Sequence, residues 1–372
     1  MQTLVLGDLH LSSHTPAAVG TDLVALLAQS RGSRVVFAGD FFDLSAETPR
    51  PALALEHGFA AHPEVARALA EHLERGEIVW LAGNHDSEAW PSAADVARAL
   101  GVTGEAAGRM RVSPWFFRQG ALHVEHGHLF DPDNAPAHPL ASARGTLGVH
   151  FVEEFIAKTG AFAYLNANDK TPLELFLDAF RWYGRRGPFV VYTYFRAAFS
   201  ALGKSGRFWD ADASRAEAGL AAFLEDAGLD ETRARALMSE HATPTMASLA
   251  DTLARLYLDR VTATVSILAG MSALALGRRR LAFVLGAAGL AGLAWSWSRG
   301  HDRYGGKVPA RLDEGARRVA RATGAELVVF GHTHEVLDRD GYSNTGSFAF
   351  PRRAPGRPYV AIDGVRAERR FF

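Results

Sequence analysis

Five short polar clusters in this 372-residue chain have residue types suited to holding metal ions. They are Gly7-Asp8-Leu9-His10, Gly39-Asp40-Phe41-Phe42-Asp43, Gly83-Asn84-His85-Asp86, His126-Gly127-His128 and Gly331-His332-Thr333-His334. Carboxylates, amide oxygens and neutral imidazoles are ligands that Mn, Fe, Co, Ni and Zn accept. Each cluster follows an apolar run typical of a buried strand, and ligand-handling residues of an α/β sheet gather at the carboxyl ends of its strands. We therefore expect the clusters to converge on one divalent-metal site.

Each cluster alone has a structural explanation. Asp-X-His and Gly-Asp segments can form a cap or an Asx turn, and His-Thr-His can be a chance pair. Asn84-His85-Asp86 is harder to explain in this way, because no turn requires those three residues directly after a buried strand. Together, in this order and each behind an apolar run, the five clusters favour a metal site over independent turns.

Composition excludes several other kinds of chemistry. The chain has no cysteine, which rules out disulfides, a thiolate nucleophile and a cysteine zinc site. A net charge of −1 gives no general attraction for nucleic acid, so we do not expect a nucleic-acid partner. The N-terminus, MQTLVLGDLH, lacks the basic start and apolar stretch of a signal peptide, and we expect residence in the cytoplasm.

The elements that must position these clusters follow an α/β pattern with an interruption. Over residues 1–135, short apolar runs ending in glycine alternate with segments of helical spacing. The same pattern resumes over residues 301–372. Between them, residues 136–300 are rich in Ala, Leu, Phe and Arg at helical spacing. We therefore predict one α/β domain in two parts, with a helical insertion large enough to be a domain of its own.

The motifs D-X-H, G-D-X-X-D, G-N-H-D, H-G-H and G-H-T-H together resemble those of the calcineurin-like metallophosphoesterase superfamily. The resemblance covers roughly residues 1–130 and 310–372. It implies a four-layer α/β/β/α sandwich, here with a large α-helical insertion. It also implies two bound divalent metal ions, for which we expect manganese, with iron, zinc, cobalt or nickel as alternatives. No other cofactor is expected.

The resemblance implies a role for individual residues. The first metal would be held by Asp8, His10 and His334, the second by Asn84, His126 and His332, with Asp40 bridging both. His85 resembles the histidine that contacts the phosphate and protonates the leaving group, and we expect Asp86 to orient it. Two nearby cations would lower the pKa of a bridging water and neutralise charge on the phosphoryl oxygens. The expected reaction is hydrolysis by in-line attack at phosphorus.

We expect structural roles for the other polar residues near these motifs and for the remaining histidines. We expect Asp43 and His128 to be hydrogen-bond partners of ligand imidazoles, not catalytic groups. Five histidines match no motif and are expected at the surface or in packing: His57, His62, His72, His123 and His138.

The superfamily spans protein phosphatases, nucleases, cyclic-nucleotide phosphodiesterases and the hydrolase that cleaves UDP-diacylglucosamine, and its fold does not choose among them. The chain is similar to the last in its early D-L-H and in its helical insertion, which in that enzyme receives acyl chains. It differs in having His85 where that enzyme has Arg and His128 where it has Asp, and its insertion is longer.

The composition of two parts of the insertion indicates contact with lipid. Residues 181–207 contain six basic residues, no acidic ones and many aromatics, a composition suited to anionic headgroups, with a solvated helix face as the alternative. Residues 261–297 form two apolar runs, each about 25 Å long as a helix, against a hydrocarbon core of about 30 Å. Small residues recur there at helix-packing spacings, and Trp295 and Trp297 suit an aromatic belt.

Three arginines at the tip of this apolar hairpin, Arg278 to Arg280, oppose a simple spanning arrangement. A spanning hairpin would carry them to the far side, against the positive-inside tendency. A hairpin that only dips into the bilayer avoids this conflict, and so does one that packs in a soluble homodimer or over a lipid-binding groove.

We therefore predict a dimetal phosphoesterase, membrane-associated on the cytoplasmic face of the inner or plasma membrane. Its substrate would be a phosphate monoester, diester or pyrophosphate of a lipid-linked or amphipathic molecule. One alternative is a phosphoesterase of soluble nucleotides or phosphoproteins that the hairpin merely anchors, or that is soluble in the cytoplasm. Another is a non-catalytic membrane adaptor with a vestigial metal site. The intact ligand set argues against the adaptor, because a degenerate site should have lost Asp40, Asn84 or His332.

Overall fold

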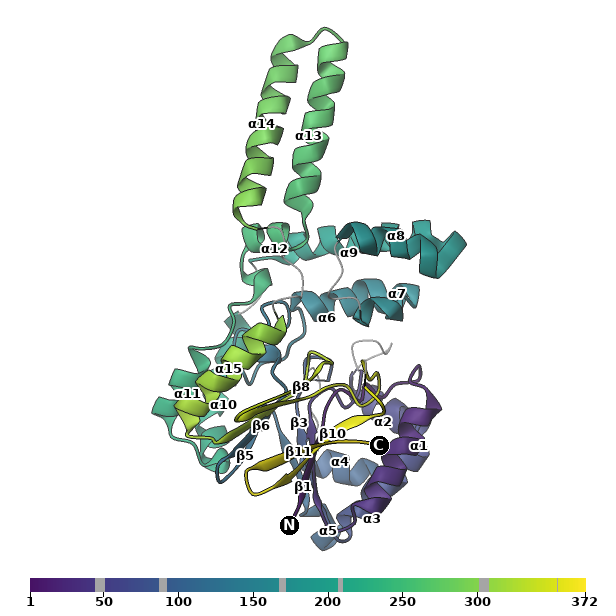
Figure 1. The fold of residues 1–372 in the computed structure, drawn as a ribbon, viewed down its shortest axis with the longest axis vertical. Helices are drawn as coiled ribbons and strands as arrows, with labels where there is room; N and C mark the ends of the chain where they lie inside the picture. Colours follow the sequence, from purple (N-terminus) through teal and green to yellow (C-terminus); the bar gives the residue numbers. More distant parts are fainter. Residues whose placement is uncertain (44–50, 87–91, 167–171, 207–209, 301–307, 353) are drawn as a thin grey trace. The chain divides into compact units, whose positions relative to one another are not determined.

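The computed structural model describes residues 1–43, 51–86, 92–166, 172–206, 210–300, 308–352 and 354–372. The chain forms two compact units (Figure 1). The first comprises Met1–Glu153, Trp209–Pro244 and Val308–Phe372, and the second comprises Glu154–Phe208 and Thr245–Lys307. We describe each unit by itself.

The first unit contains a six-stranded sheet in the order β11-β10-β1-β2-β3-β4. Its strands are β1 (Thr3–Leu6), β2 (Arg34–Ala38), β3 (Glu77–Leu81), β4 (Met110–Ser113), β10 (Pro358–Asp363) and β11 (Arg366–Phe371). β1 to β4 run parallel, and β10 pairs antiparallel with β1 and β11. The carboxyl ends of β1, β2 and β3, where three of the polar clusters begin, therefore meet at one edge.

A five-stranded sheet in the order β5-β6-β7-β9-β8 completes the strands of this unit. Its strands are β5 (Phe116–Gln119), β6 (Leu122–Glu125), β7 (Leu327–Phe330), β8 (Val336–Arg339) and β9 (Tyr342–Thr345). β6, β7 and β9 are parallel neighbours, although about 200 residues of chain separate β6 from β7. This pairing sets the cluster after β6 beside the cluster after β7.

Alternating side chains divide the core of the first unit into three hydrophobic clusters. Val5 of β1 packs between the two sheets with Val124 and Val329, whereas Leu4 and Leu6 pack on the other face of β1. That outer face is covered by α1 (Ala17–Gln29), α3 (Pro63–Leu73) and α4 (Ala93–Ala99). The outer face of the smaller sheet packs against α10 (Asp210–Ala227), α11 (Glu231–Met238) and α15 (Val308–Thr323). The predicted mixed α/β class is confirmed.

Short helices complete the first unit: α2 (Pro51–Ala61), α5 (Gly104–Ala107), α6 (Leu147–Phe151) and a 3-10 turn, η1 (His128–Phe130). Helices α6, α10 and α11 lie inside the range predicted as the insertion, yet they belong to this unit. The reason for α10 and α11 is apolar packing, because Leu220, Leu224 and Leu237 join the hydrophobic cluster that contains Phe116 and Val328.

The second unit is helical. Its elements are a π-helical segment, η2 (Val152–Ile156), which begins at the boundary, then α7 (Ala157–Thr159), η3 (Phe162–Asn166), α8 (Pro172–Tyr183), η4 (Gly184–Arg186), α9 (Gly187–Lys204), η5 (Thr245–Ala247), α12 (Leu249–Arg255), α13 (Leu258–Ala275) and α14 (Arg279–Ser298). Helices α8 and α9 pack on each other, and α12 contacts both α9 and α13.

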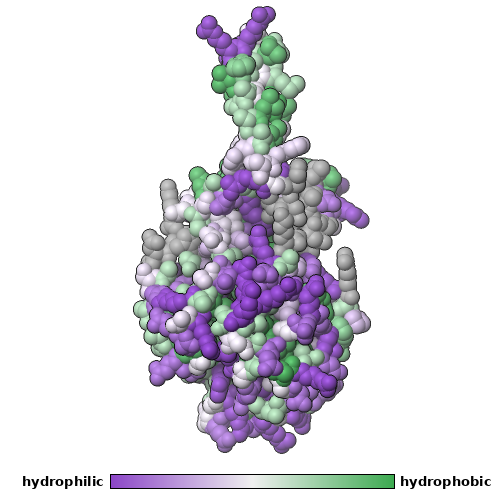
Figure 2. Space-filling view, turned by 60° about the vertical axis from the view of Figure 1, so that its left-hand side comes forward, coloured by the Kyte–Doolittle hydropathy of each residue, from purple (hydrophilic) through white to green (hydrophobic). Residues whose placement is uncertain are grey.

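Helices α13 and α14 form a hairpin, hereafter the apolar hairpin, whose small residues lie at the contact between the helices. A Cβ on Gly289 would lie 2.7 Å from the carbonyl oxygen of Ala263, so glycine is needed for this approach. The Ser266 hydroxyl donates to the Leu285 carbonyl at 2.8 Å. Only 28% and 11% of the residues in the apolar windows of α13 and α14 are buried. Figure 2 shows hydrophobic side chains along the hairpin and hydrophilic ones at its tip.

Candidate metal centre

The loops that carry the polar clusters have an unusual backbone. Six non-glycine residues with positive φ occur in the described part of the chain, and five of them are predicted metal ligands. These five are Asp8 (56°), His10 (47°), Asp40 (50°), His332 (71°) and His334 (58°). Left-handed backbone costs an L-residue about 1–2 kcal/mol, so such residues persist where the surrounding structure fixes them. Their concentration in three loops marks this edge of the sheets as a candidate functional site.

Glycines in the same loops let backbone and side chains approach closely. A Cβ on Gly83 would lie 2.0 Å from Asp40 Oδ1, and one on Gly39, whose φ is 85°, would lie 2.4 Å from His126 Nδ1. The Cβ on Gly83 would also lie 2.3 Å from the backbone nitrogen of Asp40, and the one on Gly39 2.6 Å from His126 Cβ, so any larger residue would displace a predicted ligand. The glycines of G-D-X-X-D and G-N-H-D therefore belong to the construction of the site.

Asp8, His10 and His334 form one group whose ligand atoms lie within 4.8 Å of one another. The Nε2 atoms of His10 and His334 are 3.1 Å apart, and His334 Nε2 lies 3.2 Å from Asp8 Oδ1. Asp8 Oδ1 is buried and accepts no hydrogen bond of acceptable alignment. Burial alone would raise the pKa of Asp8, but the imidazoles of His334 and His126 hold it below its usual value. The group is thus a buried carboxylate facing two imidazole nitrogens.

Asp40 lies between this group and a second one. Asp8, Asp40 and His126 offer ligand atoms within 4.8 Å of one another, and so do His10, Asp40 and His85. Asp40 is buried, which would raise its pKa, yet the nearby rings of His126 and His85 hold its pKa well below the usual range. This is the position expected of a carboxylate shared by two cations.

The second group also contains Asn84. His126 Nε2 lies 3.3 Å from Asp40 Oδ2 and 3.1 Å from Asn84 Oδ1. The other ring nitrogen, His126 Nδ1, lies 2.8 Å from the carbonyl oxygen of Ala38, which fixes the ring with Nε2 toward the site. Burial would lower the pKa of His126, but Asp40 raises it to about 10. The His126 Nε2 atom therefore faces two oxygen-bearing side chains, those of Asp40 and Asn84.

His332 lies beside the second group, with its ring centroid 5.1 Å from that of His126. Its Nε2 lies 3.0 Å from Asp131 Oδ2, and its backbone N–H donates to Asp8 Oδ2 at 3.0 Å. The structure therefore brings His332 to the site, but its side chain contacts Asp131 and belongs to neither of the groups above.

Asp131 and Asn134 are site residues that sequence reasoning missed. Asn134 Nδ2 donates to Asp131 Oδ2 at 2.7 Å, and its Oδ1 accepts from Asn84 Nδ2 at 3.1 Å. Burial would raise the pKa of Asp131, but the contact with His332 lowers it to about 2. The available signal was the run D-P-D-N directly after H-G-H-L-F, which places three more oxygen-bearing side chains close behind a predicted ligand.

The predicted orientation of His85 needs a correction. His85 Nδ1 lies 2.9 Å from Asp43 Oδ1, so Asp43, not Asp86, orients the ring. Asp86 is wrong for this role because its carboxylate accepts the backbone N–H groups of Gly83 (2.7 Å) and Phe41 (2.8 Å) and so joins two loops. Asp43 was expected beside a ligand imidazole; its carboxylate contacts the imidazole predicted to act on the phosphate, and its charge also acts on the ring of the predicted ligand His10.

The pKa values of His85 and Asp86 are both raised, but by different surroundings. Burial would lower the pKa of His85, but Asp40 and Asp43 raise it to about 9, so the ring is cationic at neutral pH. Burial and the neighbouring Asp40 raise the pKa of Asp86 to about 7. A partly buried imidazolium at the edge of a cluster of oxygen and nitrogen ligands can bind a phosphate oxygen and donate a proton.

The remaining histidines have packing positions. The His128 ring packs 5.3 Å from that of His126, and its Nδ1 has no hydrogen-bond partner among the described residues. His62, His72, His123 and His138 are buried, and His57 is exposed.

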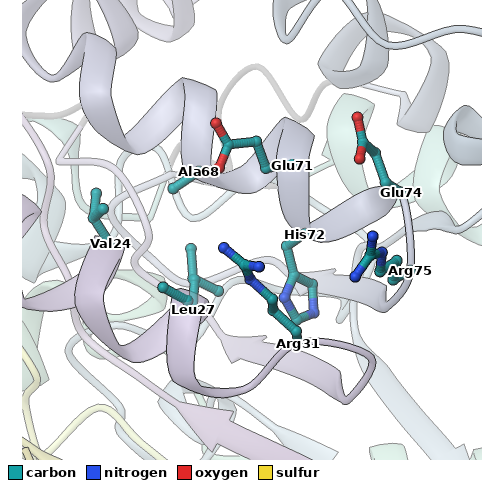
Figure 3. A pocket seen from close by; sticks show the side chains of 9 residues that line it. Val24, Leu27, Arg31, Ala68, Glu71, His72, Glu74 and Arg75 are labelled. Carbon is teal, nitrogen blue, oxygen red and sulfur yellow. The ribbon is translucent and has the colours of Figure 1, made fainter.

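A pocket of about 200 Å³ lies elsewhere in this unit, between α1 and α3 (Figure 3). Arg31, Glu71, His72 and Arg75 are among its lining residues, and none of the predicted site residues is. His72 Nε2 lies 3.1 Å from the Ser33 carbonyl oxygen, a contact between α3 and the loop before β2. The pocket is therefore separate from the metal centre.

The donor set fits divalent cations. Carboxylate oxygens, an amide oxygen and imidazole nitrogens converge, and the buried Asp8 Oδ1 without a hydrogen bond is a coordination position already formed. The opposed Nε2 atoms of His10 and His334 also suit a shared cation better than two neutral rings, which can form only one hydrogen bond there.

The sequence model of the calcineurin-like phosphoesterase family matches residues 1–189, which is more than half of the chain. The match contains four of the five polar clusters, and the fifth lies in the loop after β7. No curated protein matches the chain. The chain belongs to the calcineurin-like phosphoesterase family, as its motifs predicted, and is a metal-dependent phosphoesterase with a dinuclear metal requirement.

Proposed function

We propose that this phosphoesterase hydrolyses a phosphate ester or pyrophosphate of a lipid-linked or amphipathic substrate at the cytoplasmic face of a membrane. In this proposal the domain has the four-layer arrangement of its family, interrupted by the helical insertion at residues 136–300. The proposed action at a membrane rests on the apolar hairpin.

In the proposed site, Asp8, His10 and His334 would hold one cation, Asn84, His126 and His332 would hold the other, and Asp40 would be shared by both. We propose manganese for both positions. A pair of divalent cations would supply a water of lowered pKa and positive charge against the phosphoryl oxygens. The chain's own residues supply the rest: the Ala38 carbonyl fixes the His126 ring, and Asn134 fixes the Asn84 amide so that its oxygen faces the site.

His85 is the proposed general acid. The Asp43 carboxylate lies 2.9 Å from Nδ1 of its ring and orients the ring, and His85 offers a ligand atom within 4.8 Å of those of His10 and Asp40. Because its pKa is raised to about 9, the ring carries a proton at neutral pH, which it can transfer to the leaving oxygen.

The apolar hairpin supports action at a membrane by exposing large apolar side chains on both helices. Met271, Phe283 and Leu290 are 63%, 76% and 63% exposed. Soluble domains rarely present a continuous apolar surface of this kind to water. The helices of 18 and 20 residues are about 27 and 30 Å long, against a hydrocarbon core of about 30 Å. A bilayer would therefore cover the side chains that the protein leaves exposed.

The tip of the hairpin limits how it enters the bilayer. Arg278, Arg279 and Arg280 are exposed and follow the left-handed Gly277. A hairpin of this length brings them to the opposite headgroup layer, where guanidinium groups bind lipid phosphates. A dipping hairpin would instead bend the three arginines back toward the surface of entry.

Replacing residues 258–298 by a short Gly-Ser linker tests the proposal. We expect the manganese-loaded full chain to hydrolyse bis-p-nitrophenyl phosphate or p-nitrophenyl phosphate and to co-sediment with vesicles. The linker variant should keep the first activity and lose co-sedimentation. Lipid extracts from cells lacking the protein should accumulate a phosphorylated lipid by mass spectrometry.

The alternatives give other outcomes. Undiminished co-sedimentation of the linker variant would remove the hairpin from membrane binding, and a hairpin-dependent homodimer in solution would assign it to self-association. Turnover of soluble nucleotides or phosphoproteins without any accumulating lipid would make the hairpin a mere anchor. Metal binding without hydrolysis of either synthetic ester would support a vestigial site.

A further inference from the structure

The second unit has another apolar surface, on helices α8 and α9. Six large apolar side chains are exposed there: Phe176, Leu177, Phe180, Phe189, Tyr192 and Phe199. We call these six residues the α8–α9 surface. Exposed apolar residues normally occur singly, whereas these gather on two helices that pack on each other.

The exposed side chains of α9 lie on one face of the helix. Phe189, Tyr192, Arg196 and Phe199 recur at intervals of three and four residues, which is the spacing of one helical stripe. The opposite side of α9 contains the buried Val190 and Ala197 and packs against α7 and α12. The stripe therefore points away from the helices that support α9.

Positive charge accompanies this apolar stripe. Arg181, Arg185, Arg186 and Arg196 are all exposed. Arg196 Nη2 lies 3.8 Å from Glu154 Oε2, and Arg186 Nη2 donates to the Thr159 carbonyl at 2.9 Å. The acidic residues of the two helices are the exposed Glu174 and the buried Asp178. The surface thus combines aromatic rings with an excess of guanidinium groups, the composition of helices that lie in an anionic membrane interface.

Within the second unit, α12 lies at the base of the apolar hairpin, and α9 and α8 extend from there to one side, crosswise to the hairpin (Figure 1). That base is held together by Arg260, whose Nε donates to Ser296 Oγ at 3.1 Å and whose Nη2 donates to the Gly300 carbonyl at 2.9 Å. The Arg260 guanidinium also lies 4.9 Å from the centre of the Tyr257 ring. Helix α12 links the base to α9. A hairpin inserted along the bilayer normal would therefore set α8 and α9 parallel to the headgroup layer.

We propose that the α8–α9 surface docks on the anionic headgroups of the leaflet that the hairpin enters, with its rings at the acyl boundary and its arginines on lipid phosphates. This inference rests on the proposed insertion of the hairpin and adds to it a second contact with a preference for anionic lipid. The occupant is a bilayer because the apolar stripe and the arginines lie together at the base of an element with the length of a membrane helix.

The test uses the full chain with single cysteines, which is straightforward because the sequence has none. An environment-sensitive fluorophore is attached at Tyr192→Cys, at Leu268→Cys on the hairpin and at Val365→Cys. Val365 is an exposed apolar residue in the turn between β10 and β11 of the first unit and serves as the matched control. Each labelled protein is reconstituted in phosphatidylcholine vesicles with or without phosphatidylglycerol, and quenching by a nitroxide lipid and by a water-soluble quencher is measured.

We expect the label at position 192 to be quenched by the nitroxide lipid in anionic vesicles and much less in neutral ones. The label at 268 should be quenched in both, and the label at 365 in neither. Because a basic residue near an anionic surface contributes about 1 kcal/mol, the double substitution Arg181→Gln with Arg185→Gln should lower the ratio of docked to undocked label roughly 25-fold. The matched pair Arg215→Gln with Arg233→Gln, exposed arginines of the first unit, should leave it unchanged.

The outcomes separate the two proposals. Lipid quenching at 268 with water exposure at 192 in anionic vesicles overturns the docking inference and leaves the hairpin inserted. Water exposure at 268 overturns hairpin insertion itself. Protection at 192 that follows protein concentration instead of lipid composition assigns the surface to a second copy of the chain. A label at Phe199→Cys repeats the measurement on the same stripe if the variant at 192 does not fold.

Discussion

The metal centre and the apolar hairpin depart from ordinary protein architecture in opposite directions. In the metal centre, carboxylates and imidazoles are buried, and five of their residues have left-handed backbone. In the hairpin, the backbone is regular helix and large apolar side chains are exposed. Buried polar groups need a partner, and so do exposed apolar ones. The comparison shows two regions that each lack a partner within the chain; divalent cations suit the first, and in our proposal a lipid phase covers the second.

The largest effect is expected from removing the carboxylate of Asp40, which belongs to the metal centre and not to the hairpin. Asp40→Asn should lower kcat/KM for bis-p-nitrophenyl phosphate by at least about a thousandfold, because the residue lies between both groups of ligands. Bound manganese, measured by elemental mass spectrometry, should fall with it. Vesicle co-sedimentation should not change, and a parallel loss of membrane binding would show that the two regions are not independent.

The reverse experiment places charge on the hairpin. Leu268→Arg with Leu290→Arg puts two guanidinium groups on its exposed apolar faces, each costing about 2.5–3.5 kcal/mol near the bilayer centre. Co-sedimentation with vesicles should fall by roughly two orders of magnitude or more, while hydrolysis of the synthetic diester stays at the level of the unsubstituted chain. Unaltered vesicle binding would contradict bilayer contact by these faces.

A smaller effect is expected from adding a methyl group at Gly83, where the backbone lies close to Asp40. Gly83→Ala places a Cβ against Asp40, and we expect a loss of about 1–3 kcal/mol of unfolding free energy together with weaker manganese binding. Gly219→Ala in α10 is the matched control: nothing lies within 4 Å of its Cβ, so it should stabilise the helix by about 0.5–1 kcal/mol. Urea denaturation with and without manganese measures both, and equal behaviour of the two variants would remove the steric argument.

The mildest test concerns pH. Because Asp40 and Asp43 raise the pKa of His85 to about 9 in the folded protein, the proton on His85 stabilises the fold fully below its unfolded pKa of about 6.5. This contribution is lost as pH rises through 9. In the dependence of kcat on pH, we expect Asp43→Asn to shift the loss of activity at alkaline pH toward lower pH. The amount of bound metal should change little. A variant that loses metal instead would assign Asp43 to ligand support.

The sequence predicted the α/β class and the gathering of the polar clusters, because each cluster follows a strand of strongly apolar residues. It did not predict the contacts of Asp86 and Asp43. Each is the last residue of its motif, and only the folded loops determine which carboxylate reaches the His85 ring and which accepts backbone N–H groups.

Asp131 and Asn134 were missed for a related reason. Their contacts with His332 and Asn84 span 201 and 50 residues of chain, and no local pattern indicates pairs so far apart. The assignment of α10 and α11 to the first unit likewise depends on packing against β5 and β7, whereas their amphipathic sequences are equally suited to other helical partners.

The position of β7 in its sheet has a consequence for biosynthesis. β7 is hydrogen-bonded to β6 on one side and β9 on the other, and it precedes the loop that carries His332 and His334. A ribosome makes the whole hairpin before it makes β7, so the nascent chain at that stage has β6 without β7, and it has five of the seven predicted ligands without His332 and His334. The apolar hairpin is therefore synthesised before the metal centre can assemble. In our proposal, the chain reaches the membrane before it can hydrolyse a substrate.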